Sequence, residues 1–246
     1  MQTNEIQVIS LLRSVLKRST FVEQNKNIPH LFVNAVDGLG LTKLQLSNEE
    51  LFEPGLPYTA GAFGCALSHL LLWKQAIATN KHITIAEDDA IFRNDFIDTQ
   101  KKILASIPTN WDIVLWGWNF DSILSFNVMP GVSPAVTVFN QEQLRASIPS
   151  FKEIHTEPAA FKLDKLFGIP AYTISPKGAK KFKALCFPLK NFTLNAPLIN
   201  GNIPNYGIDI AMCNIYQSTD SYVCFPPLVV TKNDHSISSI QEKSPI

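Results

Sequence analysis

The sequence predicts an α/β fold in which helices flank a mainly parallel β-sheet. Short apolar runs typical of buried strands alternate along the chain with longer runs of helical periodicity. Hydrophobic residues make up 46% of the 246 residues and charged residues 17%, which supplies a full core and excludes a disordered chain. We expect a single domain over residues 1–246, with two halves at 1–120 and 121–246.

The elements of the first half follow from these runs. Apolar segments predict strands, periodic segments predict helices, and a turn signal such as Asp37-Gly38 marks a boundary. The expected strands are at 6–10, 30–36, 82–86 and 111–116, and the expected helices at 11–25, 62–78 and 96–107. The helix at 62–78 is apolar on nearly all sides, so we expect it to be buried.

The second half is less regular. Residues 119–134 predict a loop, residues 187–206 predict a long Asn- and Pro-rich connection, and residues 147–167 fit no single element. The expected strands are at 135–139, 171–174 and 222–225, and the expected helices at 176–185 and 206–216. From Thr231 onward we expect a polar, peripheral segment.

Charge and cysteine content narrow the function. The 21 basic and 21 acidic residues give zero formal net charge, which argues against broad electrostatic binding of nucleic acid. None of the four cysteines forms a C-x-x-C pair, so a zinc ribbon is not expected. The sequence predicts neither a membrane span nor a signal peptide. We therefore expect a cytoplasmic protein with reduced thiols.

Three consecutive carboxylates, Glu87, Asp88 and Asp89, follow the strand expected at 82–86. Strand alternation points Glu87 and Asp89 to one side and Asp88 to the other. Adjacent carboxylates repel one another unless a cation or water lies among them, and oxygen ligands select a hard cation. The triplet therefore indicates a site for a metal and a nucleoside diphosphate. A solvated acidic turn, with Asp89 as a cap, is the alternative.

The segment 61–69 is the second notable feature. Gly61 and Gly64 would allow the backbone to approach a ligand or another element closely. Ser68 and His69 add polar groups to an otherwise apolar helix. Tight helix packing, with His69 bonded to a carbonyl in the core, explains the same residues without a ligand.

Together these segments resemble glycosyltransferase family 25, which includes bacterial lipooligosaccharide and collagen galactosyltransferases. Residues 61–73 are similar to the family pattern G-x-x-G-C-x-x-S-H-x-x-x-W, and residues 87–89 fall where the family has E-D-D. Weaker similarities cover nearly the whole chain, at 8–18, 32–38, 111–114, 171–179, 209, 226–228 and 236–237. The chain departs from the pattern at Ser10, where Asn is usual, and at Ile208, where Pro often stands.

The resemblance implies a GT-A-type fold, a UDP-sugar donor and a divalent metal, Mn²⁺ or Mg²⁺. It implies an inverting hexosyl transfer, with galactose expected before glucose, to the oligosaccharide of a lipooligosaccharide or lipopolysaccharide. The half at 1–120 would then bind the nucleotide-sugar and metal, and the half at 121–246 the acceptor. Because the acceptor is lipid-linked, peripheral contact with the inner face of the inner membrane is expected.

Site roles follow from the same resemblance. It places the metal on Asp89 and on His235, and makes Asp209 the general base that deprotonates the acceptor hydroxyl. Alternatively, Asp209 is an ordinary capping residue, and His235 is an exposed residue of the tail. The candidates for nucleotide-sugar binding are Arg13, Arg18, Asp37, Ser68, His69, Glu87 and Asp88. Ser68 and His69 could instead brace the acidic segment.

Two other classes of function stay open. A non-catalytic sugar-binding module would bind the donor without turnover. A metal-dependent phosphohydrolase also uses acidic clusters, but it usually needs more carboxylates or histidines than we can place near Glu87. Lys177, Lys180, Lys181 and Lys183 could contact acidic headgroups, although a solvated charged face is the simpler interpretation.

Overall fold

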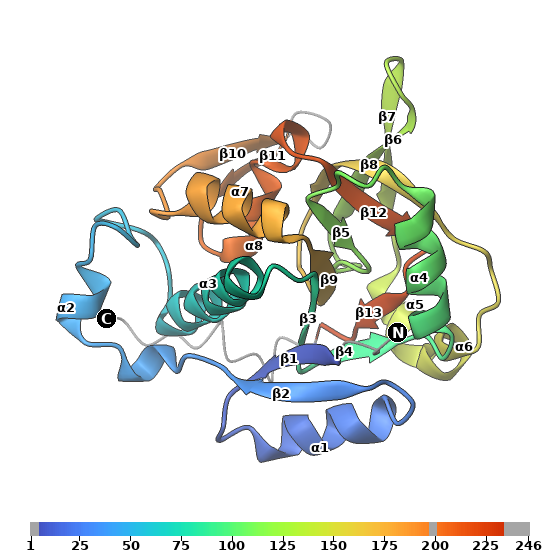
Figure 1. The fold of residues 1–246 in the computed structure, drawn as a ribbon, viewed down its shortest axis with the longest axis horizontal. Coiled ribbons are helices and arrows are strands. Elements are labelled where there is room, and N and C mark those ends of the chain that lie inside the picture. The colour runs from blue at the N-terminus through green and yellow to red at the C-terminus, as the bar shows by residue number, and fades with distance from the viewer. Residues whose placement is uncertain (1–4, 197–200, 234–246) are drawn as a thin grey trace.

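The computed structural model describes residues 5–196 and 201–233, and its centre is a nine-stranded sheet in the order β2-β1-β3-β9-β5-β12-β8-β6-β7 (Figure 1). The strands are β1 Ile6–Ser10, β2 His30–Asn34, β3 Ile83–Glu87, β4 Ala90–Phe92, β5 Ile113–Leu115, β6 Ile123–Met129, β7 Ser133–Val138, β8 Ala159–Leu166, β9 Ala171–Ile174, β10 Thr193–Ala196, β11 Gly201–Pro204, β12 Ser221–Phe225 and β13 Val229–Thr231. The helices are α1 Val15–Gln24, η1 Gly38–Gly40, α2 Lys43–Leu46, α3 Ala60–Thr79, α4 Phe96–Ser106, α5 Gln141–Ala146, α6 Ile148–Lys152, α7 Pro176–Cys186, α8 Ile208–Cys213 and η3 Tyr216–Ser218.

The α/β prediction is confirmed, and the sheet is mixed. Strand β1 pairs in parallel with β2 and β3, and β12 pairs in parallel with β5. Strand β9 lies antiparallel between β3 and β5, so those two strands run in the same direction. The carboxyl ends of β1, β2, β3, β5 and β12 therefore share one edge of the sheet, which is where ligands bind in such folds.

The sheet has a hydrophobic core on each face. Alternation along β3 and β5 sends Ile85 and Leu115 into one core and Ala86 and Val114 into the other. Helices α3, α7 and α8 pack on the first face, and α1 and α4 on the second. Eleven of the 20 residues of α3 are buried, with Trp73 fully inside the first core, which agrees with the burial expected from its apolar sequence.

Several expectations for the second half are wrong. The loop expected at 119–134 instead holds β6 and the start of β7, which form a hairpin. The unassigned segment 147–167 contains α6 and β8, and the connection expected at 187–206 contains β10 and β11. The peripheral segment expected from Thr231 begins in a buried strand, because β13 pairs with β4. Each of these strands depends on a pairing partner, and local composition does not reveal that partner.

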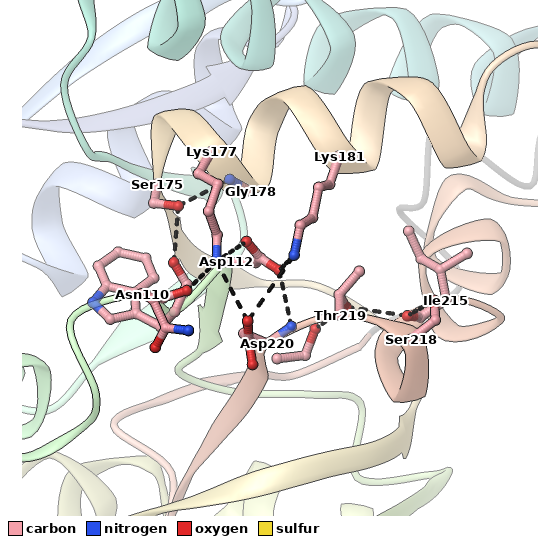
Figure 2. Close-up of polar contacts among 12 residues, drawn as sticks. Asn110, Asp112, Ser175, Lys177, Gly178, Lys181, Ile215, Ser218, Thr219 and Asp220 are labelled. Atoms are coloured by element: carbon pink, nitrogen blue, oxygen red, sulfur yellow. Dashed lines mark hydrogen bonds and ion pairs between the residues drawn. The ribbon is translucent and has the colours of Figure 1, made fainter.

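Polar contacts around the buried Asp112 join β5, β12 and the start of α7 (Figure 2). Its carboxylate lies 3.0 Å from Lys177 Nζ and 2.7 Å from Lys181 Nζ, and it accepts a 2.9 Å hydrogen bond from the backbone N–H of Asp220. Lys177 Nζ also lies 3.3 Å from the Asp220 carboxylate. Two lysines of the predicted basic cluster are thus paired within the fold.

Candidate active site

The acidic triplet lies at the carboxyl end of β3. Glu87 ends this strand, while Asp88 and Asp89 make the turn into β4. The three side chains diverge: Glu87 faces α3, Asp88 contacts β1 and α1, and Asp89 contacts β13. The triplet is therefore surrounded by elements from both ends of the chain.

Asp88 is held by the first strand and helix. Its carboxylate accepts a 2.7 Å hydrogen bond from Ser10 Oγ and lies 3.8 Å from Lys17 Nζ. Arg18 donates at 2.9 Å to the backbone carbonyl of Ser10 and at 2.9 Å to Asn34 Oδ1. Ser10, the departure from the family pattern, thus links Asp88 to the predicted donor-binding Arg18.

Asp89 is the exposed member of the triplet. One carboxylate oxygen accepts a 2.8 Å hydrogen bond from Thr231 Oγ1, at the end of β13. The segment that leads towards His235 therefore passes beside Asp89, although His235 itself lies outside the described residues. The assignment of metal to Asp89 and His235 stays a prediction.

Glu87 faces the middle of α3. Its Oε1 lies 3.8 Å from Nε2 of His69, which is fully buried, whereas the Glu87 side chain is 27% exposed. Burial lowers the pKa of His69 to about 3, so the imidazole is neutral near pH 7. Cys65 lies one turn before His69, and its Sγ, an imidazole nitrogen of His69 and a carboxylate oxygen of Glu87 lie within 4.8 Å of one another.

Asp209 reaches this site from the other half of the chain. It lies in the first turn of α8, and its Oδ2 accepts a 3.0 Å hydrogen bond from the backbone N–H of Gly168. Gly168 has φ of +76°, and a Cβ there would lie 2.2 Å from the side chain of Asn119. Glycine is therefore required for the backbone that holds Asp209.

The carboxylates form one electrostatic group. Burial raises the pKa of Glu87 well above its ordinary value, and the nearby charges of Asp89, Asp209 and Asp88 raise it further. Burial also raises the pKa of Asp209. Lys17 offsets only part of this negative charge. An oxygen-rich, negatively charged donor set fits a hard divalent cation such as Mg²⁺ or Mn²⁺.

The remaining predicted donor-binding residues lie around the loop after β2. Arg13 and Asp37 form an exposed ion pair there. Ser68 is buried, and its hydroxyl donates to the Gly64 carbonyl at 2.7 Å and accepts from the Val36 N–H at 2.8 Å. These contacts join α3 to the loop after β2 and do not involve the acidic segment, so a role for Ser68 in bracing residues 87–89 stays a prediction.

The structure adds residues that the sequence reasoning did not single out. Ser10 and Lys17 contact Asp88, and Thr231 contacts Asp89. Gly168 holds Asp209, and Tyr172 bonds to His69. For Ser10 and Tyr172 a signal existed, since both lie in segments that resemble family motifs. For Gly168 and Thr231 we find none.

Fold and site together define an α/β protein with a carboxylate-rich site at the carboxyl edge of its sheet. Residues 3–195 match the family described as glycosyltransferase family 25 (LPS biosynthesis protein). The chain belongs to this family. Membership supports a glycosyltransferase role, as the sequence motifs indicated.

Curated relatives match about half of the chain. Human procollagen galactosyltransferase 2 is 32% identical over 131 residues, which cover 46% of this chain and 20% of that protein. The probable inactive glycosyltransferase 25 family member 3 of Rattus norvegicus is 29% identical over 128 residues, covering 46% of this chain and 22% of that protein. The matched regions thus span about a fifth of these relatives.

One solved structure aligns with most of this chain, but only weakly. A mannose-1-phosphate geranyltransferase from Thermus thermophilus aligns with 91% of this chain and 73% of its own, at a TM-score of 0.32 and 10% identity. This likeness is too weak to bear on function. Within residues 5–196 and 201–233, no helix has the length and apolar character needed to cross a membrane.

Proposed function

We propose that the protein transfers a hexose from a UDP-sugar to the oligosaccharide of a lipooligosaccharide or lipopolysaccharide, with galactose as the first candidate and glucose as the second. The observation that carries the proposal is the convergence of Glu87, Asp89 and Asp209 in one acidic group. Family membership and the galactosyltransferase among the relatives support it. We place the reaction in the cytoplasm, with peripheral contact at the inner membrane.

In this proposal the acidic edge of the sheet binds the donor. Asp89 and His235 would hold the divalent cation, Mn²⁺ or Mg²⁺, which supplies positive charge to stabilise the leaving diphosphate. Glu87 or Asp88 would contact the ribose side of the donor. Arg13 and Arg18, near the carboxyl ends of β1 and β2, would bind the diphosphate or uridine.

Asp209 is the proposed general base. It would accept a proton from the acceptor hydroxyl as that oxygen attacks the anomeric carbon, while the bond to the diphosphate breaks on the opposite face. One displacement of this kind inverts the anomeric configuration. Burial raises the pKa of Asp209, which makes its carboxylate a stronger base, and a stronger base removes a hydroxyl proton more readily.

The test is UDP release from a panel of UDP-sugars with the oligosaccharide acceptor, in Mn²⁺ and then in EDTA. We expect release that needs metal, prefers one UDP-hexose and falls by about 10²-fold or more in Asp89→Ala. Asp98→Ala is the matched control, because the Asp98 side chain is 83% exposed on α4. Release that is indifferent to EDTA and to Asp89→Ala would contradict the metal role.

Two further measurements separate the alternatives. Relatives described as inactive make a non-catalytic sugar-binding module the second candidate. Donor binding by calorimetry, with no turnover of any acceptor, would favour the module. Robust release of inorganic phosphate from phosphomonoesters would favour a phosphohydrolase.

A further inference from the structure

Two buried hydrogen bonds join Trp73 and His69 of α3 through the Tyr172 hydroxyl of β9, and His69 in turn lies beside Glu87. Trp73 Nε1 lies 2.8 Å from the Tyr172 hydroxyl, and that hydroxyl lies 2.8 Å from His69 Nδ1. All three side chains are fully buried, and none belongs to the carboxylate group itself. The other imidazole nitrogen, His69 Nε2, has no hydrogen-bond partner within the described part of the chain and lies 3.8 Å from Glu87 Oε1.

The indole of Trp73 and the hydroxyl of Tyr172 determine which group donates in each of these hydrogen bonds. An indole N–H can only donate, so the Tyr172 oxygen accepts from Trp73. The hydroxyl hydrogen of Tyr172 then needs an acceptor, and among the described residues His69 Nδ1 is the one within hydrogen-bond distance. A neutral imidazole has one protonated nitrogen. Because Nδ1 accepts, the proton of His69 lies on Nε2, the nitrogen that faces Glu87.

We propose that Trp73 and Tyr172 are positioning residues that hold His69 as its Nε2–H tautomer, so that it presents a donor to Glu87. A neutral N–H directed at a carboxylate orients it and stabilises its charge without adding a cation that would compete with the metal. With the other tautomer, a lone pair would face Glu87 and repel it. The inference rests on the proposed function, in which Glu87 contacts the sugar donor.

The geometry weighs against a different use of the same residues. Cys65, His69 and Glu87 are spaced closely enough to suggest a zinc site. Zinc on His69 would need the lone pair of Nε2, so Nδ1 would carry the proton and donate to Tyr172. The Tyr172 hydroxyl would then receive two donors, and its own hydrogen would have no acceptor among the described residues.

The first measurement is the tautomer of His69 in the intact wild-type protein, by ¹H–¹⁵N correlation of the histidine rings. His69→Gln identifies the signal among the five histidines of the chain. We expect a pure Nε2–H pattern in the wild type and a loss of that pattern in Tyr172→Phe. Tyr216→Phe is the matched control, since the buried Tyr216 hydroxyl has no hydrogen-bond partner to lose among residues 5–196 and 201–233. An Nδ1–H pattern in the wild type would overturn the proposal, as would loss of the Nε2–H signal on adding one equivalent of Zn²⁺.

Kinetics supply the second readout. We expect Tyr172→Phe to raise KM for the UDP-sugar about 10-fold, with a smaller change in kcat, while Tyr216→Phe leaves both unchanged. Glutamine at position 69 offers an N–H whatever the state of Tyr172, so Tyr172→Phe should have little further effect when added to His69→Gln. An undiminished 10-fold effect in that background would refute the positioning role. Absence of turnover in the wild type would refute the proposed function, and the wild-type spectrum would still decide the tautomer.

Discussion

The substitution Gly64→Ala tests the close packing of α3 against the loop after β2, which lies at the proposed donor-binding edge of the sheet. In Gly64→Ala, the new Cβ would lie 2.4 Å from the Val36 carbonyl oxygen and 2.7 Å from the Gly38 nitrogen. Ordinary van der Waals contact begins at 3.4 Å. The loop after β2 must therefore move by about 1 Å, because both atoms belong to backbone that cannot rotate away.

The expected loss of stability follows from opposing terms. Alanine in a helix interior is about 1 kcal/mol more favourable than glycine. Overpacking costs about 1–3 kcal/mol, and moving the loop weakens the Ser68–Val36 hydrogen bond, which contributes about 1 kcal/mol. We expect Gly64→Ala to lower the free energy of unfolding by about 2 kcal/mol and to weaken donor binding, because the same loop carries Asp37.

Urea unfolding followed by tryptophan fluorescence measures this change. With a slope of about 2 kcal/mol per molar urea, the midpoint should fall by about 1 M. Gly40→Ala is the control, since a Cβ at Gly40 meets nothing within 4 Å, and its midpoint should be unchanged or slightly higher. If Gly64→Ala unfolds at the wild-type midpoint or above, the close approach of α3 to the loop is wrong.

Two further predictions concern the carboxylates of Asp112 and Asp209. Asp112→Ala should lower the free energy of unfolding by about 2 kcal/mol. This loss is smaller than the loss of a fully buried ion pair, because the partners Lys177 and Lys181 are 44% and 40% exposed. The exposed control Asp98→Ala should change the free energy of unfolding by less than about 0.5 kcal/mol in the same urea assay. Asp209→Asn should raise the urea midpoint at pH 7 in EDTA while abolishing transfer. Burial raises the pKa of Asp209 in the folded state, so ionisation of this carboxyl destabilises the folded protein at pH values above its ordinary pKa of 3.8. The gain in stability of the variant should therefore vanish as the pH falls below 3.8. A gain that persists at pH 3 would contradict this cause.

Much of the first half could be predicted from local patterns. The strand at 6–10 and the helices near 62–78 and 96–107 agree with β1, α3 and α4 to within about two residues, because spacing of apolar side chains encodes these elements directly. The sequence also predicted that the acidic triplet lies at the end of a strand. The β6–β7 hairpin was not, since Asn, Ser, Pro and Gly in its sequence indicate a loop.

The pairing of strands in the sheet and the contacts between distant residues at the site were decided by the tertiary structure. Nothing in the spacing of residues shows that β9 inserts antiparallel between β3 and β5, or that Asp209 comes to share one acidic group with Glu87. The sequence was enough to recognise the family and to place the carboxylates, because periodicity and motifs are local properties of the chain. The inference about which nitrogen of His69 carries the proton required the tertiary structure, because Tyr172 reaches His69 through the strand pairing between β9 and β3.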